Sequence, residues 1–364
     1  MQYKIIGLMS GSSLDGLDIV YTELQENAGE WVFTILASEC YEYDSEWKEK
    51  LKNADGLNAL EYQLLHSAYG RYLGEQVNKF IEAHSLQYKV AFISSHGHTS
   101  FHFPQKKMTA QLGDGAALAA VTGLPVVSDL RSMDIALGGQ GAPIVPIGEK
   151  YLFLGFTMFL NMGGIANVSF VNDNKHIAFD ICPANRVLNN LAAKVGKDYD
   201  ANGEMASIGN VHQELLNKLN ELPYYKQLPP KSLDNSFGAK EVYDLVRSFA
   251  LTHNDSLRTY VEHIVIQIKN AISNNYKLHN TNQKVLVTGG GAFNKFLLQR
   301  LKEELQSVSI DVVVPEEQIV QYKEALIMAF IGVLRWRQEN TVLSSVTGAE
   351  RDSIGGAVWI GQEA

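Results

Sequence analysis

The pattern of apolar and polar positions at the start of the chain predicts a three-stranded meander. Runs rich in β-branched and aromatic residues lie at 3–9, 17–24 and 31–38, each of a length that suits a strand. A polar turn with glycine, serine and aspartate separates the first two runs. We therefore expect consecutive antiparallel strands joined by short turns.

Helical and strand patterns alternate in the next part of the chain. Residues 57–84 carry an apolar stripe at helical spacing, and 90–94 form a short apolar run typical of a buried strand. We interpret the polar, histidine-rich segment 95–104 as a loop at the end of that strand. A small-residue helix at 111–120 and a strand at 124–127 are expected to follow.

The second half of the chain repeats the opening plan. Apolar runs at 158–161, 168–171 and 176–179 predict strands, and a glycine-containing turn separates the first two. The remaining pattern predicts helices at 186–195, 257–273, 295–305 and 321–337, and strands at 284–288 and 311–315. We interpret 222–237 as a connection over the surface and 344–349 as a loop. Two halves that each begin with a meander indicate a duplicated α/β fold with a cleft between the halves.

Composition and charge narrow the classes of function. A chain of 364 residues is longer than one hydrophobic core usually serves, so two domains are expected, and we place their boundary near the glycine-rich segment 138–143. A net charge of -9 argues against a general binder of nucleic acid or anionic membranes. Small molecules are the expected partners.

The cellular compartment is predicted from what the sequence lacks. No basic start and cleavage site of a signal peptide is recognisable, and no apolar run is long enough to span a bilayer. Cys40 and Cys182 make neither a disulfide framework nor a zinc cage. We expect a protein of the reducing cytoplasm.

The first turn has the chemistry of a phosphate cradle. Glycine lets backbone N–H groups point inward, hydroxyls add donors, and aspartate can hold hydrated Mg²⁺. An ordinary hairpin turn is the alternative, and a Walker-type loop is excluded because no Gly-Lys-Ser/Thr follows. The candidate residues are Gly11, Ser12, Ser13, Asp15, Gly16 and Asp18.

Histidines crowd the segment after the 90–94 strand. His96, His98 and His102 invite a metal interpretation, but their spacing matches no specific zinc signature. Hydrogen bonding to a substrate by His96, His98 and Thr99 is the better interpretation, because α/β proteins place ligand contacts at strand ends. Downstream, Arg131 is suited to a substrate carboxylate, with a salt bridge to a neighbouring aspartate as the alternative.

Three further candidates lie in the second half. Asp180 follows a predicted strand, where a carboxylate suits general-base chemistry, although such residues more often cap helices. The triple glycine at 289–291 lies between a strand and a helix, a context that favours a nucleotide site. Glu324, expected in the first turn of its helix, is ordinarily only favourable to the helix dipole.

Taken together, these segments resemble the anhydro-N-acetylmuramic acid kinase family, a branch of the sugar kinase, hexokinase and actin superfamily. The resemblance covers nearly the whole chain. It rests on several specific blocks in the right order, namely 7–18, 95–99, 138–143, 161–167, 289–292, 324–325 and 346–349.

The resemblance implies a two-domain duplicated actin-like (ribonuclease H-like) fold, with 1–135 plus 345–364 as one domain and 136–344 as the other. It implies that ATP and Mg²⁺ are bound by the first turn, with Asp15 reaching the metal through water. It further assigns ATP phosphates to a second turn with Asn161, Gly163 and Gly164, and adenosine to Gly289, Gly290 and Gly291.

The implied reaction phosphorylates O6 of 1,6-anhydro-N-acetylmuramic acid while water, deprotonated by Asp180, opens the ring at C1. Glu324 would orient that water or a sugar hydroxyl. His96, His98, Thr99 and Arg131 would hold the sugar. The implied setting is peptidoglycan recycling by a cytoplasmic homodimer, without nucleic-acid or membrane partners.

The chain departs from the commoner family pattern at two places. Ser12 replaces a threonine and keeps the hydroxyl. After Asp180, the residues 181–185 read Ile-Cys-Pro-Ala-Asn in place of Thr-Gly-Pro-Gly-Asn, so a hydroxyl and two glycines are missing. This change keeps open a second hypothesis, a non-catalytic sugar or nucleotide sensor, and a metal-dependent hydrolase using the three histidines is a third.

Overall fold

The computed structural model describes residues 1–11, 13–172, 175–229, 231–233, 237–276 and 283–361. The chain divides into two compact units. Unit 1 comprises Met1–Leu154 and Tyr322–Ala364, and unit 2 comprises Gly155–Gln321. These units assign 136–154 and 322–344 to the first half, whereas the domains expected from the sequence assign them to the second.

Unit 1 is built on a mixed sheet in the order β12-β6-β4-β1-β2-β3, with β5 also paired to β4. The first three strands form the predicted antiparallel meander, and β4 and β6 run parallel beside β1. The strands are β1 (Gln2–Ser10), β2 (Gly16–Asn27), β3 (Glu30–Glu42), β4 (Ile93–Phe103), β5 (Met108–Leu112), β6 (Val126–Ser128) and β12 (Ala357–Trp359).

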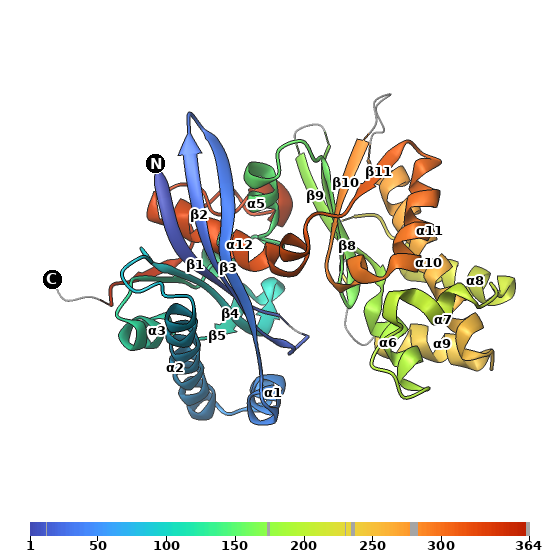
Figure 1. Cartoon of the computed structure of the whole chain (residues 1–364), viewed down its shortest axis with the longest axis horizontal. Coiled ribbons are helices and arrows are strands. Elements are labelled where there is room, and N and C mark those ends of the chain that lie inside the picture. Colours follow the sequence, from blue (N-terminus) through green and yellow to red (C-terminus); the bar gives the residue numbers. More distant parts are fainter. Residues whose placement is uncertain (12, 173–174, 230, 234–236, 277–282, 362–364) are drawn as a thin grey trace. The chain divides into compact units, whose positions relative to one another are not determined.

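Helices cover both faces of this sheet (Figure 1). On one face, α2 (Ala59–Ala83) and α3 (Gly115–Thr122) bury apolar side chains against Ile6 and Leu8 of β1. On the other face lies α12 (Glu317–Trp336), which approaches β1 so closely that a Cβ at Gly7 would lie 2.1 Å from the carbonyl oxygen of Ala325. This contact requires glycine and fixes the helix on the sheet.

Unit 2 repeats the same strand plan. Its sheet has the order β11-β10-β7-β8-β9. In this sheet β7, β8 and β9 form an antiparallel meander. Strand β10 runs parallel beside β7, and β11 runs parallel beside β10. The strands are β7 (Met158–Met162), β8 (Ile165–Asn172), β9 (Lys175–Pro183), β10 (Gln283–Thr288) and β11 (Ile310–Val313). The duplicated α/β fold is confirmed.

One face of the unit 2 sheet packs on a large helical core. Met158, Leu160 and Val285 point from the sheet into this core, together with the apolar side chains of the helices. The helices are α6 (Asn185–Ala193), α7 (Glu204–Ser207), α8 (Gln213–Asn220), α9 (Tyr243–Ser248), α10 (His253–Asn275) and α11 (Lys295–Gln306).

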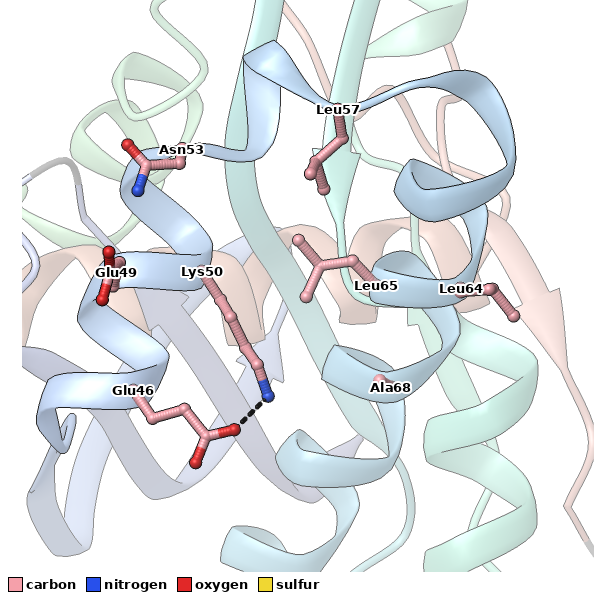
Figure 2. Close-up of a pocket in the computed structure, with 8 residues that line it drawn as sticks. All are labelled: Glu46, Glu49, Lys50, Asn53, Leu57, Leu64, Leu65 and Ala68. Carbon is pink, nitrogen blue, oxygen red and sulfur yellow. Dashed lines mark hydrogen bonds and ion pairs between the residues drawn. The ribbon is translucent and has the colours of Figure 1, made fainter.

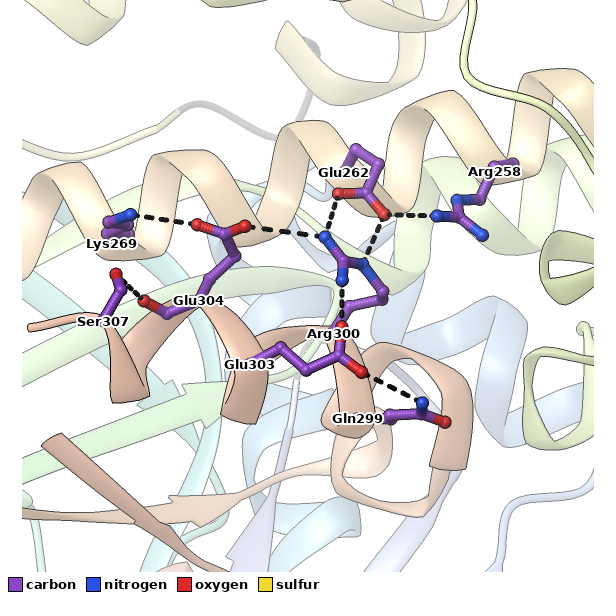
Figure 3. Close-up of polar contacts among 8 residues, drawn as sticks. All are labelled: Arg258, Glu262, Lys269, Gln299, Arg300, Glu303, Glu304 and Ser307. Atoms are coloured by element: carbon purple, nitrogen blue, oxygen red, sulfur yellow. Dashed lines mark hydrogen bonds and ion pairs between the residues drawn. The ribbon is translucent and has the colours of Figure 1, made fainter.

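An ion-pair network joins α10 to α11 (Figure 3). Glu262 of α10 accepts hydrogen bonds from Nε and Nη2 of Arg300 at 2.7 and 3.0 Å, and it pairs with Arg258 at 3.1 Å. Arg300 also pairs with Glu303, and Lys269 pairs with Glu304 at 3.0 Å. Because the Glu262 side chain is only 9% exposed, this network is expected to stabilise unit 2 more than an exposed ion pair would. We call it the α10–α11 clamp.

Three expectations about elements are wrong. The segment 95–104 is mostly strand, because β5 pairs with it and absorbs its backbone hydrogen bonds. The helix expected from 321 begins at Glu317, so Glu324 lies beyond the first turn. The segment 344–349, interpreted as a loop, contains the short helix α13 (Ser344–Thr347).

A groove of about 560 Å³ opens between α1 (Ser45–Lys52) and α2 (Figure 2). Apolar residues such as Leu57 and Leu65 line it, with Glu46 and Lys50 of α1 paired to each other at its edge. None of the predicted site residues lines this groove, so the candidate site lies elsewhere. Across the described residues, no helix is long and apolar enough to cross a membrane.

Candidate active site

The first glycine turn connects β1 to β2, two interior strands of the unit 1 sheet. It is closed by a hydrogen bond from the Leu14 N–H to the Gly11 carbonyl at 3.3 Å. Ser13 and Asp15 are exposed, and Ser12 lies outside the described residues. Gly16 is required by packing, since a Cβ there would lie 2.7 Å from Sγ of Cys40.

Asp18 follows this turn in an unusual electrostatic setting. Its carboxyl is mostly buried, and this burial raises its pKa to about 6, aided by the nearby carboxylates of Glu324 and Asp15. A hydrogen bond from the thiol of Cys40 offsets part of the rise. Burial and the Asp18 carboxylate in turn raise the pKa of Cys40 to about 12, which keeps the thiol protonated as a donor.

Behind the turn, a chain of buried hydrogen bonds orients His98. Tyr43 donates its hydroxyl to Oγ of Ser10 at 2.7 Å, and the hydroxyls of Tyr43 and Tyr69 are 2.5 Å apart. Because Tyr43 uses its proton on Ser10, Tyr69 donates to Tyr43, and Ser10 donates to Nδ1 of His98 at 3.0 Å. His98 is thus neutral, and burial lowers its pKa to about 4.

His96 and Arg131 form a second fixed pair in unit 1. Nε of Arg131 donates to Nε2 of His96 at 2.8 Å, so the ring proton sits on Nδ1 and is donated to the Gly97 carbonyl at 2.8 Å. Burial lowers the pKa of His96 to about 3 and that of Arg131 to about 10, so the first is neutral and the second charged at neutral pH. Both His96 nitrogens are engaged within the protein.

The glycine-rich segment 138–143 is held inside unit 1. The buried Asp134 accepts hydrogen bonds from the N–H of Gly141 at 2.7 Å and from the hydroxyl of Thr347 at 2.6 Å. The Gly141 carbonyl in turn accepts from Nη1 of Arg131 at 2.6 Å. This segment therefore holds Arg131 in place, and the contacts of Gly141 lie within unit 1.

Glu324 of α12 lies near both Arg131 and Asp18. Burial raises its pKa, while the charges of Lys323 and Arg131 oppose the rise. The neighbouring Lys323 forms a buried ion pair with Glu149 of α5 (Pro146–Leu152) at 2.8 Å. The helix turn that presents Glu324 is thereby fastened to α5.

The three-histidine metal hypothesis finds no support. Within the described ranges, no group of three or more His, Cys, Asp or Glu side chains is placed to hold a metal ion. His102 is exposed and bonds Thr109 instead, and Thr99 is exposed near Gln111. The strand β4 thus brings together His96 and His98, but not His102.

In unit 2, the second glycine turn packs tightly against the triple glycine. A Cβ on Gly289 would lie 2.3 Å from Oδ1 of Asn161, and one on Gly291 would lie 2.7 Å from Cβ of Met162. Asn185 fastens the turn by donating its side-chain amide to the Met162 carbonyl at 3.0 Å and its N–H to the Gly163 carbonyl at 3.1 Å. The two predicted glycine motifs of this unit are neighbours.

Asp180 is anchored at three points on the edge strand β9. Its N–H donates to the Lys231 carbonyl at 3.2 Å, and its carbonyl accepts the hydroxyl of Tyr224 at 2.6 Å. Its Oδ2 accepts the N–H of Leu233 at 2.9 Å. Burial raises the pKa of Asp180, and the Leu233 bond limits the rise.

A β-bulge in β9 determines which face of the sheet the Asp180 carboxylate lies on. Asn167 pairs with Asp180 and Ala166 with Cys182, so Ile181 is the extra residue. Phe179 and Ile181 point into the helical core, which leaves Asp180 on the opposite face of the sheet. The departure at 181–184 is accommodated, since neither Cys182 nor Ala184 has a positive φ that would require glycine.

Sequence reasoning missed the residues that hold Asp180 and the second turn. Tyr224 and Leu233 belong to the connection 222–237, which the sequence indicates only as a surface segment, and Asn185 stands at the end of the departing segment 181–185 with no role predicted for it. Non-local contacts of this kind leave no periodic signal. Two adjacent aromatic residues, Tyr224 and Tyr225, were a hint that this connection is packed against the unit.

Two units with the same strand order, each with a glycine turn after its first strand, define a duplicated α/β fold made of two similar halves. A family model for anhydro-N-acetylmuramic acid kinase matches residues 3–361. The chain belongs to the anhydro-N-acetylmuramic acid kinase family and is an enzyme of the kinase class.

Relatives in this family match over nearly the whole chain. An anhydro-N-acetylmuramic acid kinase of Sulfurimonas denitrificans is 34% identical and covers 97% of this chain and 98% of its own length. One from Sulfurovum sp. is 33% identical, with 98% and 99% covered. A solved ROK hexokinase from Thermus thermophilus aligns with a TM-score of 0.41 at 12% identity, over 92% of this chain and 99% of the hexokinase.

Proposed function

We propose that the chain transfers the γ-phosphoryl group of ATP to O6 of 1,6-anhydro-N-acetylmuramic acid while water opens the anhydro bridge at C1. The products are N-acetylmuramic acid 6-phosphate and ADP. Family membership supports this proposal, and one observation carries it within the chain. Asp180 is a carboxylate fixed at three points, and its second oxygen, Oδ1, has no hydrogen-bond partner among the described residues.

The chemistry assigns one role to Asp180. The water oxygen forms a bond to C1, the C1–O6 bond breaks, and its electron pair stays on O6, which takes the phosphoryl group. The water proton passes to Oδ1 of Asp180. A carboxylate whose pKa is raised by burial suits this role, because a base works best when its pKa lies nearer the working pH.

The side chains of unit 1 fit the anionic groups of the substrates. Arg131 donates from Nε to His96 and from Nη1 to the Gly141 carbonyl. Its remaining N–H groups are left to bind the lactyl carboxylate of the sugar. Glu324 would orient the water or a sugar hydroxyl. The turn that contains Gly11 and the turn that contains Asn161 are the candidate phosphate contacts.

Mg²⁺ fits the donor set of the first turn. Asp15 and Asp18 offer carboxylate oxygens, which are the ligands that Mg²⁺ prefers, and Asp15 is exposed enough to act through water. When bound, the ion supplies charge neutralisation for the phosphates. A cytoplasmic homodimer that serves peptidoglycan recycling completes the proposal.

An isotope experiment tests the reaction. The purified protein with Mg-ATP is expected to consume the anhydro sugar in H₂¹⁸O, and mass spectrometry should find ¹⁸O at C1 and none in the phosphate ester. Sugar binding without turnover would instead support the sensor hypothesis. Turnover with no label at C1 would contradict the assigned chemistry.

Replacing the base tests the assigned residue. We expect Asp180→Asn to lower kcat by at least about 100-fold, because proton transfer by a positioned base contributes that much or more. ATP affinity, measured by calorimetry, should stay near wild type, since the base acts after binding. Near-normal turnover by this variant would show that another residue is the base.

A further inference from the structure

A row of polar side chains crosses four neighbouring strands of the unit 2 sheet. Thr288 of β10 pairs with Asn161 of β7, Asn161 pairs with Asn167 of β8, and Asn167 pairs with Asp180 of β9. Directly paired residues point to the same face of a sheet. All four side chains therefore stand on the face opposite the helical core.

These polar groups have unused hydrogen-bonding capacity. Among the described residues, the side-chain amides of Asn161 and Asn167 have no hydrogen-bond partner, and neither has Oδ1 of Asp180. The hydroxyl oxygen of Thr288 is buried and also lacks a partner there, although the residue is only 1% exposed. Because folded proteins pair nearly all their buried polar groups, the unpaired hydroxyl of Thr288 points to a bound ligand atom or water. Asn161, Asn167 and Asp180 are partly exposed, so a ligand can reach the rest of the row from solvent.

Asn167 occupies the decisive place in this row. It stands directly opposite Asp180, so the two Cβ atoms are expected to be about 5 Å apart, a separation that leaves room for one water between the polar ends. The bulge at Ile181 sets this pairing, since without it Asn167 would face a core residue. The arrangement belongs to the sheet itself rather than to a loop.

We infer that Asn167 is a positioning residue that holds the attacking water against Oδ1 of Asp180, an inference that rests on the proposed function. The water donates one hydrogen to the amide oxygen of Asn167 and the other to Asp180. Its lone pairs are then left for C1, and Glu324 orients a sugar hydroxyl rather than this water. The proton on the Asp180 side leaves with the base, the new bond forms between the water oxygen and C1, and the Asn167 contact fixes the direction of attack.

Asn167→Ala tests this inference, with Ser169→Ala as the matched control. Ser169 lies on the same strand and the same face but pairs with Ala178 instead of Asp180. We expect Asn167→Ala to lower kcat about 100-fold, since misplacement by about 1 Å costs that much, with the KM for ATP unchanged. The control should keep at least half of the wild-type kcat.

A second variant separates positioning from structure. Asn167→Asp keeps an acceptor oxygen but adds a charge beside Asp180, which disfavours ionisation of the base. We expect partial recovery of kcat relative to Asn167→Ala, with the acidic limb of the pH profile moved to higher pH. Thermal melting and ATP titration of each variant check whether the fold is intact.

Three results would overturn the inference. These are wild-type kcat in Asn167→Ala, an equal loss in Ser169→Ala, and a rise in the KM for the sugar with kcat unchanged. In each of these cases the proposed function stands, because the wild-type protein still converts the sugar. Absence of sugar turnover by the wild-type protein would overturn the proposed function and this inference together.

Discussion

At the scale of single residues, Asp180 depends on a distant tyrosine. Tyr224 donates to the Asp180 carbonyl at 2.6 Å, and its neighbour Tyr225 bonds His263 at 3.0 Å instead. The two tyrosines are adjacent in sequence and both pack in unit 2, Tyr224 buried and Tyr225 partly buried, but only Tyr224 touches the candidate base. They offer a matched pair for separating a role in positioning from one in stability.

We expect Tyr224→Phe to lower kcat about 10-fold, because the backbone of the base loses one of its anchors. Tyr225→Phe should leave kcat within twofold of wild type. Each change removes one hydrogen bond and should cost about 1 kcal/mol of unfolding free energy in denaturant titrations. Equal effects of the two variants on kcat would contradict the positioning role of Tyr224.

Asp18 predicts a conflict between stability and function. Its pKa in the folded protein is about 6, above the ordinary value of 3.8, so the folded state binds the proton more tightly than the unfolded state does. The unfolding free energy should therefore fall as pH rises from about 4 to about 6. Partial solvent exposure limits the effect to about 1–2 kcal/mol.

Asp18→Asn is expected to remove this fall in unfolding free energy, because the amide does not ionise. Melting temperatures measured from pH 4 to pH 8 should show the variant gaining on the wild type as pH rises, and turnover with Mg-ATP should fall. Asp55→Asn, at an exposed position in the turn between α1 and α2, is the control and should leave both quantities unchanged. A parallel pH dependence of Asp18→Asn and wild type would show that Asp18 has an ordinary pKa.

At the scale of elements, α12 and β1 form a contact in unit 1 that leaves no room for a side chain larger than glycine's. A Cβ at Gly7 would lie 2.1 Å from the Ala325 carbonyl oxygen and 2.8 Å from Cβ of Ala329. The helix would have to move away from the strand, and Glu324 would move with it. Backbone on one side and a helix on the other leave little freedom to relax.

Gly7→Ala is therefore expected to lower the unfolding free energy by about 1–3 kcal/mol, the usual cost of overpacking. Turnover should also fall in the folded fraction. Gly56→Ala is the control, since nothing lies within 4 Å of its added Cβ. Urea titration measures both variants, and an unaffected Gly7→Ala would mean that α12 packs more loosely than described.

Elements were predictable from the sequence where one period dominated. The meander strands, the 57–84 helix and the second meander carry clear periods of two or 3.6 residues. The segment 95–104 was predicted as a loop because its strand structure depends on pairing with β5. Pairing between two strands cannot be recognised from either strand's sequence alone. The start of α12 was predicted too late in the chain because Glu317 and Gln318 lie outside the apolar stripe of the helix.

The candidate site was predictable only in part. The glycine turns, Asp180 and the His96 segment were found through their motifs, since their residue types are chemically distinctive. The anchors Tyr224 and Leu233, and the facing of Asn167 and Asp180, depend on contacts between segments distant in sequence. Register shifted by one residue at Ile181, which no local pattern reveals.

At the scale of the whole molecule, two units with separate hydrophobic cores predict two unfolding transitions. Glu262→Ala breaks the α10–α11 clamp and should lower the stability of unit 2 by about 2 kcal/mol, because Arg258 loses its carboxylate partner and Arg300 keeps only its partners on α11. Gly7→Ala should instead affect unit 1. Calorimetry of the two variants should therefore shift different transitions, and equal shifts of a single transition would contradict independent unfolding.

An exposed pair provides the control for the clamp. Glu46 and Lys50 of α1 pair across one helical turn, with side chains 72% and 44% exposed. Glu46→Ala should change the unfolding free energy by less than about 0.5 kcal/mol, since exposed pairs contribute little. A loss as large as that in Glu262→Ala would show that burial does not distinguish the two ion pairs.

The nesting of the units has a consequence for biosynthesis. Unit 2 is a continuous stretch, whereas unit 1 is completed by α12 and by the edge strand β12 near the end of the chain. A ribosome that makes the protein from its N-terminus therefore delivers all of unit 2 before the last parts of unit 1 exist. The β6 edge, which β12 covers in the finished sheet, stays unpaired during that interval, so the nascent chain exposes an open strand edge that can pair with another chain.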